Sequence, residues 1–518
     1  MPKVKINGQE VEVPQGSTII QAFKAAGHDI CHYCWHPGLS IAGVCRLCMV
    51  QIEGMPRLQI ACNTEVKDGM VVNNTSDMVK ETVKWGLDFH LINHPLDCPI
   101  CDQAGECGLQ DQYMQFGQYD PQMAEPKVKK HKVIDLGPTV VLDSERCILC
   151  SRCVRFTDEV SKTNELGIFN RGDRSEIGTV EGKPLNNKYS LNTVDICPVG
   201  ALTSKDFRFR QRVWYLKEAD SICPGCSTGC NVKVHYNEEG LWRVKPRHNP
   251  EVNGYWMCDI GRDTYKYVNI KNRLLAAKVG RRDTWQEMSP LDGARTAGMR
   301  ISDLVQTHGA DSVALVLTGQ YTNEEYKDLL VYFVTQLKLK TIYHWANNPE
   351  KMEEFDGLLL RGDRNPNTKG LQAALKQAGT HGKWEDLQAA LGGKKIKAVV
   401  VAGPEDQSVF PDMKEKIQMF SQADNLIWLT SCPSADLDQA GCDTWQIPVK
   451  THVEKAGTFT NFKGLEQKFP LGTTIVPQAL TLSEVADVFH GRDLNWAMRP
   501  KGLGGTKNNY ATLARGDL

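Results

Sequence analysis

Residues 146–153 read Arg-Cys-Ile-Leu-Cys-Ser-Arg-Cys, and a Cys-Pro pair follows at residues 197–198. Cysteines spaced two residues apart suit a corner of a [4Fe–4S] cubane, and the distant cysteine can supply the fourth ligand. Zinc also accepts four thiolates, but this close spacing crowds a tetrahedral ion. The sequence therefore predicts a cubane held by Cys147, Cys150, Cys153 and Cys197.

A second cysteine-rich stretch lies upstream, at residues 94–107. Its three cysteines can bind three irons of another cubane, which leaves one ligand to be found. His94 is the nearest candidate, and a neutral imidazole in place of a thiolate should raise the potential. Three alternatives stay open: His90 is a rival, His94 could simply pack near a helix end, and zinc could use the same residues. The candidate ligands are His94, Cys98, Cys101 and Cys107.

A third set of cysteines lies near the N-terminus, in a loop followed by a remote Cys62. Plant-type [2Fe–2S] centres are held in this way, although the first gap here is longer than in C-x4-C-x2-C. Cys31 competes with Cys34, and buried structural thiols are the alternative interpretation. The predicted [2Fe–2S] ligands are Cys34, Cys45, Cys48 and Cys62.

A fourth set of cysteines follows further downstream. Its spacing fits a cubane and a zinc ribbon equally well, because C-x2-C pairs serve zinc too. Three other cysteines, Cys31, Cys432 and Cys442, are expected to be ordinary buried thiols. The fourth set is Cys223, Cys226, Cys230 and Cys258.

Composition limits the function classes. The 518 residues suffice for three or four domains of about 150 residues. The 61 Lys and Arg residues are balanced by 62 Asp and Glu residues, which argues against bulk binding of nucleic acid or an anionic membrane. No apolar run approaches the ~18 residues that span a bilayer, and no secretory signal is visible. We therefore expect a soluble cytoplasmic protein, whose thiols stay reduced and serve as metal ligands rather than disulfides.

Hydrophobic patterns predict two kinds of fold. The N-terminus is expected to be β-grasp-like, with a hairpin turn at Asn7-Gly8 and a helix that Ser17 caps and Gly27 ends. A helix is expected over residues 76–93, with Met78, Val83 and Leu87 on one face, and a surface connector over 121–132. Past residue 273, alternating strands and helices predict a parallel sheet. Expected strands are 3–6, 10–13, 49–53, 70–72, 312–317, 341–345, 398–402 and 426–430; expected crossover helices are 324–337 and 413–423.

Together these motifs resemble one family, the large iron–sulfur subunit (75-kDa or G subunit) of respiratory complex I, NADH–quinone oxidoreductase. The segments that carry the resemblance are 34–48, 97–107, 146–153 and 196–202, and it covers about the first 260 residues. The resemblance implies a [2Fe–2S] cluster at the N-terminal set that begins with Cys34, a His94-ligated cubane, and a second cubane at the set that begins with Cys147. The fourth set resembles an extra cubane of some bacterial members and of molybdopterin oxidoreductases, off the main electron route.

The resemblance extends to the fold. It implies a multidomain protein, α+β and then α/β, that ends in a shortened molybdopterin-oxidoreductase-like domain, and residues 457–464 are similar to a recurring segment of that fold. No molybdopterin is expected, since no cysteine lies between residues 258 and 432 to bind molybdenum. The expected domains are a β-grasp [2Fe–2S] ferredoxin-type domain (1–78), a His(Cys)3 [4Fe–4S] module (79–120), a ferredoxin-like [4Fe–4S] module (121–215), a molybdopterin-oxidoreductase-type [4Fe–4S] domain (216–272) and a degenerate α/β domain (273–518).

The resemblance implies electron transfer from NADH towards quinone, with no residue acting as general acid, base or nucleophile. No G-x-G-x-x-G loop follows a strand, so NADH is expected to bind a flavin-containing partner subunit. Other partners would be iron–sulfur subunits of the peripheral arm, without nucleic acid. The chain would lie peripherally on the cytoplasmic side of the cell membrane, in contact with it only through the complex. Alternatives are the catalytic subunit of an NAD-dependent formate dehydrogenase and the electron-transfer subunit of an NAD-reducing hydrogenase.

Overall fold

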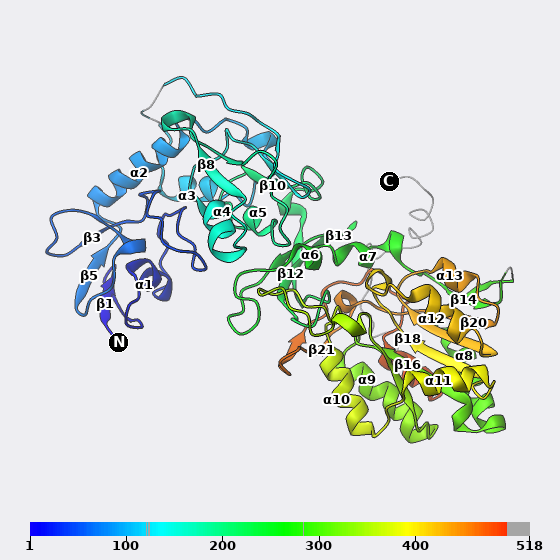
Figure 1. The fold of residues 1–518 in the computed structure, drawn as a ribbon. Helices are drawn as coiled ribbons and strands as arrows, with labels where there is room; N and C mark the ends of the chain where they lie inside the picture. Colours follow the sequence, from blue (N-terminus) through cyan, green and yellow to red (C-terminus); the bar gives the residue numbers. More distant parts are fainter. Residues whose placement is uncertain (121, 123–124, 283, 495–518) are drawn as a thin grey trace. The chain divides into compact units, whose positions relative to one another are not determined.

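The computed structural model describes residues 1–120, 122, 125–282 and 284–494, which form two compact units (Figure 1). The first unit comprises residues 1–215 and the second begins at residue 216. In the described ranges, no helix is long and apolar enough to cross a bilayer. Parts of the expected connector over 121–132, and the expected α/β domain beyond residue 494, lie outside the described residues.

A five-stranded sheet opens the first unit, in the order β2-β1-β5-β3-β4. Asn7 and Gly8 form the turn of the first hairpin with φ of 49° and 91°, a left-handed backbone that an Asn-Gly pair tolerates. The sequence prediction of a β-grasp-like sheet is confirmed. Its strands are β1 (Lys3–Ile6), β2 (Gln9–Glu12), β3 (Met49–Ile52), β4 (Gln59–Ile60) and β5 (Met70–Asn73).

Two helices of this unit correct details of the sequence analysis. α1 (Ile19–Ala25) is capped by Thr18 and not by Ser17, because Gln21 reaches back and accepts a hydrogen bond from the Thr18 amide at 2.8 Å. α2 (Asp77–Leu91) buries Val79, Val83 and Leu87 at four-residue spacing. Met78 was expected on that face and is instead 49% exposed, since it lies about 100° around the helix from Val79.

The remainder of the first unit is built from short elements around the cysteine loops. α3 (Gly108–Phe116) follows Cys107 directly. A three-stranded sheet has the order β10-β7-β6, and α4 continues into a π-helical turn over Phe156–Val160. The elements are β6 (Ile134–Asp135), β7 (Val140–Leu142), α4 (Arg152–Arg155), β8 (Leu166–Phe169), β9 (Glu176–Thr179), α5 (Asn192–Asp195) and β10 (Leu202–Ser204).

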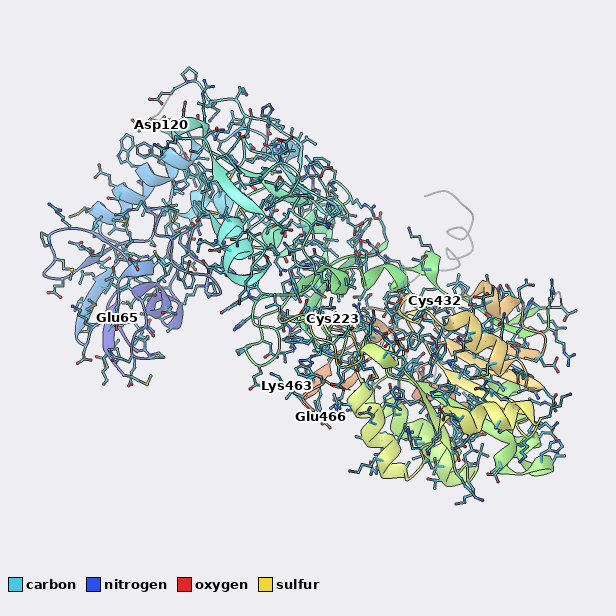
Figure 2. All side chains as sticks on the ribbon, in the orientation of Figure 1. Glu65, Asp120, Cys223, Cys432, Lys463 and Glu466 are labelled. Atoms are coloured by element: carbon cyan, nitrogen blue, oxygen red, sulfur yellow. The ribbon has the colours of Figure 1, made fainter. Side chains whose placement is uncertain are left out.

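The second unit begins with an antiparallel sheet of β11 (Lys217–Ile222), β12 (Asn231–Asn237) and β13 (Gly240–Pro246). The loop between β11 and β12 carries three cysteines, and Cys258 precedes the short helix α6 (Asp259–Arg262). Figure 2 labels Cys223, which directly follows β11. The helix α7 (Tyr265–Val268) then leads towards the larger sheet.

The larger sheet has seven strands in the order β15-β14-β20-β19-β18-β16-β17. The five strands from β20 to β17 are parallel; four of them were predicted, and β20 was not. The strands β14 and β15 run antiparallel at one edge, so the sheet is mixed rather than purely parallel. The strands are β14 (Ala277–Gly280), β15 (Gln286–Met288), β16 (Val313–Thr318), β17 (Ile342–Trp345), β18 (Ala398–Ala402), β19 (Asn425–Thr430) and β20 (Asp443–Pro448).

Helices cover both faces of this sheet (Figure 1). Leu315 and Leu317 face one core, and Val316, one residue out of phase, faces the other, because strand side chains alternate. The expected helix over 324–337 consists of α9 (Asn323–Leu330) followed by a π-helical turn over Val331–Gln336. One face is covered by α8 (Pro290–His308), α9 (Asn323–Leu330), α10 (Thr368–Ala378) and α14 (Leu482–Phe489), and the other by α11 (Trp384–Gly392), α12 (Met413–Phe420) and α13 (Ala435–Asp438).

Candidate metal centres

The three cysteines of residues 146–153 line one pocket, with Cys197 among them. This 147–197 site (Cys147, Cys150, Cys153 and Cys197) lies between the loop after β7, the helix α4 and the loop after α5. Leu149 and Ser151 have φ of 54° and 60°, so the loop turns back between successive cysteines. The pocket is narrow, about 20 Å³. Burial raises the pKa of Cys147 to about 12 and that of Cys150 to about 11, so a bound metal must displace thiol protons.

A second pocket, of about 220 Å³, is lined by all four residues of the 94–107 site (His94, Cys98, Cys101 and Cys107). Burial above all lowers the pKa of His94 to about 4, with Arg146 and Lys127 adding to the effect. The imidazole is therefore neutral at physiological pH, which is the form that binds metals. Its Nδ1 atom is buried without a hydrogen-bond partner.

The rival histidine of this site is engaged elsewhere. The Nδ1 atom of His90 lies 2.7 Å from the Gly86 carbonyl oxygen, and its ring packs edge-on against Tyr33 with the centroids 5.3 Å apart. His90 does not line the pocket that His94 and the three cysteines share. The geometry thus favours His94 over His90 as the fourth ligand.

A glycine near Cys197 provides space for the 94–107 site. A Cβ atom on Gly200 would lie 2.3 Å from the Cys101 sulfur and 3.1 Å from the Gln103 Cβ. The Gly108 amide also donates to the Pro198 carbonyl oxygen at 2.9 Å. The Cys-Pro segment therefore carries a candidate ligand of one site and forms a wall of the next.

The four sulfurs of the 34–62 site (Cys34, Cys45, Cys48 and Cys62) are buried together. Contacts with the thiols of Cys45 and Cys62 lower the pKa of Cys34, and a contact with Cys62 likewise lowers the pKa of Cys48. The competitor Cys31 instead donates to the Gln112 side-chain oxygen at 2.9 Å. The structure therefore gathers the four predicted residues and gives Cys31 a different partner.

The fourth set forms the 223–258 site (Cys223, Cys226, Cys230 and Cys258), and all four cysteines are buried. The Cys223 amide donates to the Cys230 carbonyl oxygen at 2.8 Å and closes the loop. Burial is the main cause that raises the pKa of Cys258 to about 12. A Cβ atom on Gly261 would lie 2.9 Å from the Cys223 sulfur and 3.5 Å from the Cys258 sulfur, so this glycine keeps the space between them open.

Distant parts of the second unit support this cysteine loop. The segment of residues 457–464 forms β21 (Gly457–Thr460) and the turn towards β22 (Glu466–Phe469), a turn that Lys463 and Glu466 mark in Figure 2. The Phe462 amide donates to the Ser227 carbonyl oxygen at 2.9 Å, and Gln467 donates to the Gly229 carbonyl oxygen at 2.9 Å.

The donor sets fit multi-iron clusters. Each set offers four sulfur or imidazole donors. Gly200 at the 94–107 site and Gly261 at the 223–258 site leave space beside the sulfurs, and the Nδ1 atom of His94 has no hydrogen-bond partner. Within the described ranges, no three His, Cys, Asp or Glu side chains converge closely enough to hold a single ion.

Arginines that contact these loops were missed by the sequence reasoning. Arg212 donates to the carbonyl oxygens of Cys101 and Pro99 at 2.6 and 2.8 Å. Arg364 donates to the Gly225 carbonyl oxygen at 2.8 Å. Arg152 and Arg155 contact the loops of two sites at once. The only signal in the sequence is the position of Arg152 inside the Cys-Ser-Arg-Cys motif.

Comparison with known domain families finds four consecutive matches. They are described as a 2Fe-2S iron-sulfur cluster binding domain (residues 2–77), an NADH-ubiquinone oxidoreductase-G iron-sulfur binding region (86–121), the ferredoxin-like domain of NADH-quinone oxidoreductase subunit 3 (137–203) and a molybdopterin oxidoreductase Fe4S4 domain (216–270). The NADH-quinone oxidoreductase G subunit of Streptomyces coelicolor is 38% identical over 316 residues. The chain is a homologue of this large iron–sulfur subunit.

Two further relatives agree with this homology. The G subunit of Rickettsia felis is 41% identical over 265 residues, which cover 51% of this chain and 39% of that protein. The mitochondrial NADH dehydrogenase [ubiquinone] iron-sulfur protein 1 of Solanum tuberosum is 33% identical over 416 residues, 75% of this chain and 54% of that protein. The Streptomyces match covers 61% of this chain and 37% of the relative, so this G-subunit homologue spans about half or less of these relatives.

Proposed function

We propose that this chain carries electrons as the iron–sulfur subunit of an NADH–quinone oxidoreductase, complex I. The observation that carries the proposal is the succession of four ligand sets, three of them within one compact unit, in the order of the matching domains. Iron–sulfur clusters accept and release single electrons, so a row of them conducts electrons through the protein. The chain's own residues hold the clusters, exclude water and set their potentials.

The proposed cofactors are one [2Fe–2S] cluster at the 34–62 site and [4Fe–4S] clusters at the 94–107, 147–197 and 223–258 sites. The proposed ligands are the sixteen residues named for these sites. The proposed domains keep the boundaries 1–78, 79–120, 121–215, 216–272 and 273–518, and the division between the two compact units after residue 215 supports one of these boundaries.

The C-terminal domain is proposed to be structural and to bind no molybdopterin. In parallel sheets of this kind, ligands bind beyond the carboxyl ends of the strands, where the strand order reverses. Here that point lies between β16 and β18. The loops that follow these strands bind each other there, because the Gln320 side-chain oxygen accepts hydrogen bonds from the amides of Glu405 and Asp406 at 2.6 and 3.0 Å.

A buried ion network occupies the same edge of the sheet. The Lys455 ammonium lies 2.8 Å from the Glu325 carboxylate and 3.6 Å from that of Glu405, and all three side chains are at most 4% exposed. His452 lies 3.2 Å from Glu405. Lys455 offsets the charge of both carboxylates, although the Oε2 atom of Glu405 has no hydrogen-bond partner, and the network supports a structural role for the domain.

The proposed partners are a flavin subunit that binds NADH and the neighbouring iron–sulfur subunits. Membrane contact is proposed only through the complex, on its cytoplasmic side. Electrons would enter from the flavin subunit and leave towards quinone through those neighbours.

The test is elemental analysis of the anaerobically purified chain for iron, sulfide, zinc, molybdenum and tungsten. One [2Fe–2S] and three [4Fe–4S] clusters require ~14 iron atoms per chain. Iron near that value without molybdenum or tungsten would support the proposal. Stoichiometric molybdenum or tungsten would instead favour a catalytic formate dehydrogenase, and zinc at the 223–258 site would reduce the expected iron to ~10 atoms.

A further inference from the structure

Two arginines connect the 34–62 site to the 147–197 site. Arg152 donates from Nη2 to the Trp35 carbonyl oxygen at 2.7 Å and from Nη1 to the Ile196 carbonyl oxygen at 3.1 Å. Trp35 follows the ligand Cys34, and Ile196 precedes the ligand Cys197. One guanidinium group therefore holds the backbone beside a ligand of each site.

Arg155, one turn later on α4, repeats this connection. Its Nη2 donates to the carbonyl oxygens of both Cys34 and Cys150, the latter at 3.3 Å. Its Nη1 donates to the Ser40 carbonyl oxygen in the loop between Cys34 and Cys45. Both arginines thus place positive charge between the same two sets of sulfurs.

Sulfurs of both sites lie near the guanidinium group of Arg152. As thiolates, Cys150 and Cys197 of one site and Cys34 of the other favour its positive charge, whereas Arg155 repels it. Its Nε atom is buried without a hydrogen-bond partner, and its other donors bind neutral carbonyl groups. Carbonyl oxygens solvate a guanidinium but do not neutralise it. A desolvated charge is costly unless an opposite charge lies close by, and thiolates carrying a cluster supply one.

We propose that Arg152, assisted by Arg155, is a positioning residue that sets the reduction potentials of the clusters at the 34–62 and 147–197 sites together. The inference rests on the proposed function, since it requires clusters at both sites. Reduction adds one negative charge to a cluster. A fixed positive charge stabilises the reduced form and raises the potential, more strongly where water is excluded. Because one group lies beside both sites, its removal lowers both potentials.

The test is a potentiometric titration of the full chain, purified anaerobically and followed by electron paramagnetic resonance. Arg152→Gln removes the charge and keeps hydrogen-bond donors. We expect the equilibrium constant for reduction to fall about tenfold at both the 34–62 and 147–197 sites, which is 59 mV for a one-electron couple. At the other two sites, the equilibrium constants for reduction should stay within about twofold of their values in the unsubstituted chain.

Two further variants separate charge from structure. Arg152→Lys keeps the charge but not the forked geometry of the guanidinium group. In this variant, the equilibrium constants for reduction at both sites should lie within about threefold of those in the unsubstituted chain. Arg171→Gln, at an exposed arginine of the same unit, should shift no cluster. Unchanged potentials in Arg152→Gln with all clusters present, a shift at only one of the two sites, or equal shifts in the Gln and Lys variants would overturn the proposal.

Iron and sulfide content is measured before each titration. If Arg152→Gln loses a cluster, the Arg152→Lys variant becomes the test. Potentials close to those of the unsubstituted chain would support the electrostatic role, whereas a tenfold fall in the equilibrium constants for reduction would overturn it. Absence of either cluster from the unsubstituted chain would overturn the proposed function itself. The iron and sulfide content of the unsubstituted chain therefore distinguishes that result from failure of the inference about Arg152.

Discussion

Arg273 and Glu454 form an ion pair in which both side chains are completely buried, with Nη1 and Oε2 2.5 Å apart. Arg273 also donates to the carbonyl oxygens of Ser431 and Val449, at 3.2 and 3.0 Å. Glu454 accepts from the amides of residues 475 and 476 at 2.9 and 2.7 Å. The pair therefore joins the segment before β14 to the loops after β19 and β20.

Breaking this pair should destabilise the second unit strongly. Arg273→Leu leaves the Glu454 carboxylate buried without its counter-charge, which typically costs about 3–5 kcal/mol. The free energy of unfolding, from urea titration at pH 7, should fall by that amount.

An exposed ion pair provides the matched control. Arg281 lies 2.6 Å from Asp443, with side chains 58% and 44% exposed. Arg281→Leu should cost less than about 1 kcal/mol, because water screens the pair. Equal losses in the two variants would contradict the assignment of the Arg273 effect to buried charge.

The identity of the fourth ligand at the 94–107 site can be tested by two histidine substitutions. His94→Cys replaces a neutral imidazole with a thiolate, so the cluster should persist with a lower reduction potential. His90→Ala should leave both iron content and potential unchanged, because the His90 ring contacts Gly86 and Tyr33 instead. Electron paramagnetic resonance titration measures both effects, and loss of the cluster in the His90 variant alone would reverse the assignment.

The space beside Cys101 should be intolerant of a single methyl group. Gly200→Ala would place Cβ 2.3 Å from the Cys101 sulfur, which forces this sulfur, a proposed ligand, to move. We expect selective loss of the 94–107 cluster, about 4 iron atoms per chain. Gly392→Ala is the control, since nothing lies within 4 Å of its added Cβ. Iron analysis of the two variants measures the effect. Full iron content in both would show that the space beside Cys101 is not required for the cluster.

Acid should destabilise the second unit through His344 in β17. Burial lowers the pKa of His344 to about 4, His381 adds to the effect, and its Nε2 atom is buried without a partner. The unfolded chain, with an ordinary histidine pKa of about 6.5, binds the proton more readily. Stability therefore falls as pH drops from about 6.5 to 4, and the fall between pH 7 and pH 5 is about 2 kcal/mol.

A leucine substitution isolates this contribution. His344→Leu should remove about 2 kcal/mol of the pH dependence between pH 7 and pH 5, measured by urea unfolding at both values. His308→Leu, at an exposed histidine, should retain it. An unchanged pH dependence in His344→Leu would mean that other groups cause the acid sensitivity.

Local sequence signals predicted much of the fold correctly. The Asn7-Gly8 turn, four of the five strands of the N-terminal sheet and four of the five parallel strands of the large sheet follow from patterns over a few residues, because turn geometry and side-chain alternation are local properties. The strands β4 and β20 were not predicted. The errors were local too: the cap lies at Thr18, and Met78 lies off the buried face of α2.

The sequence by itself determined which residues are available as ligands, because cysteines two or three residues apart stay close in any compact fold. The tertiary structure decided which distant residues join them. It turns Cys31 towards Gln112 and brings Arg152 to the carbonyl group of Trp35, 117 residues away. Such contacts depend on how separate elements pack, and no spacing within a motif encodes them.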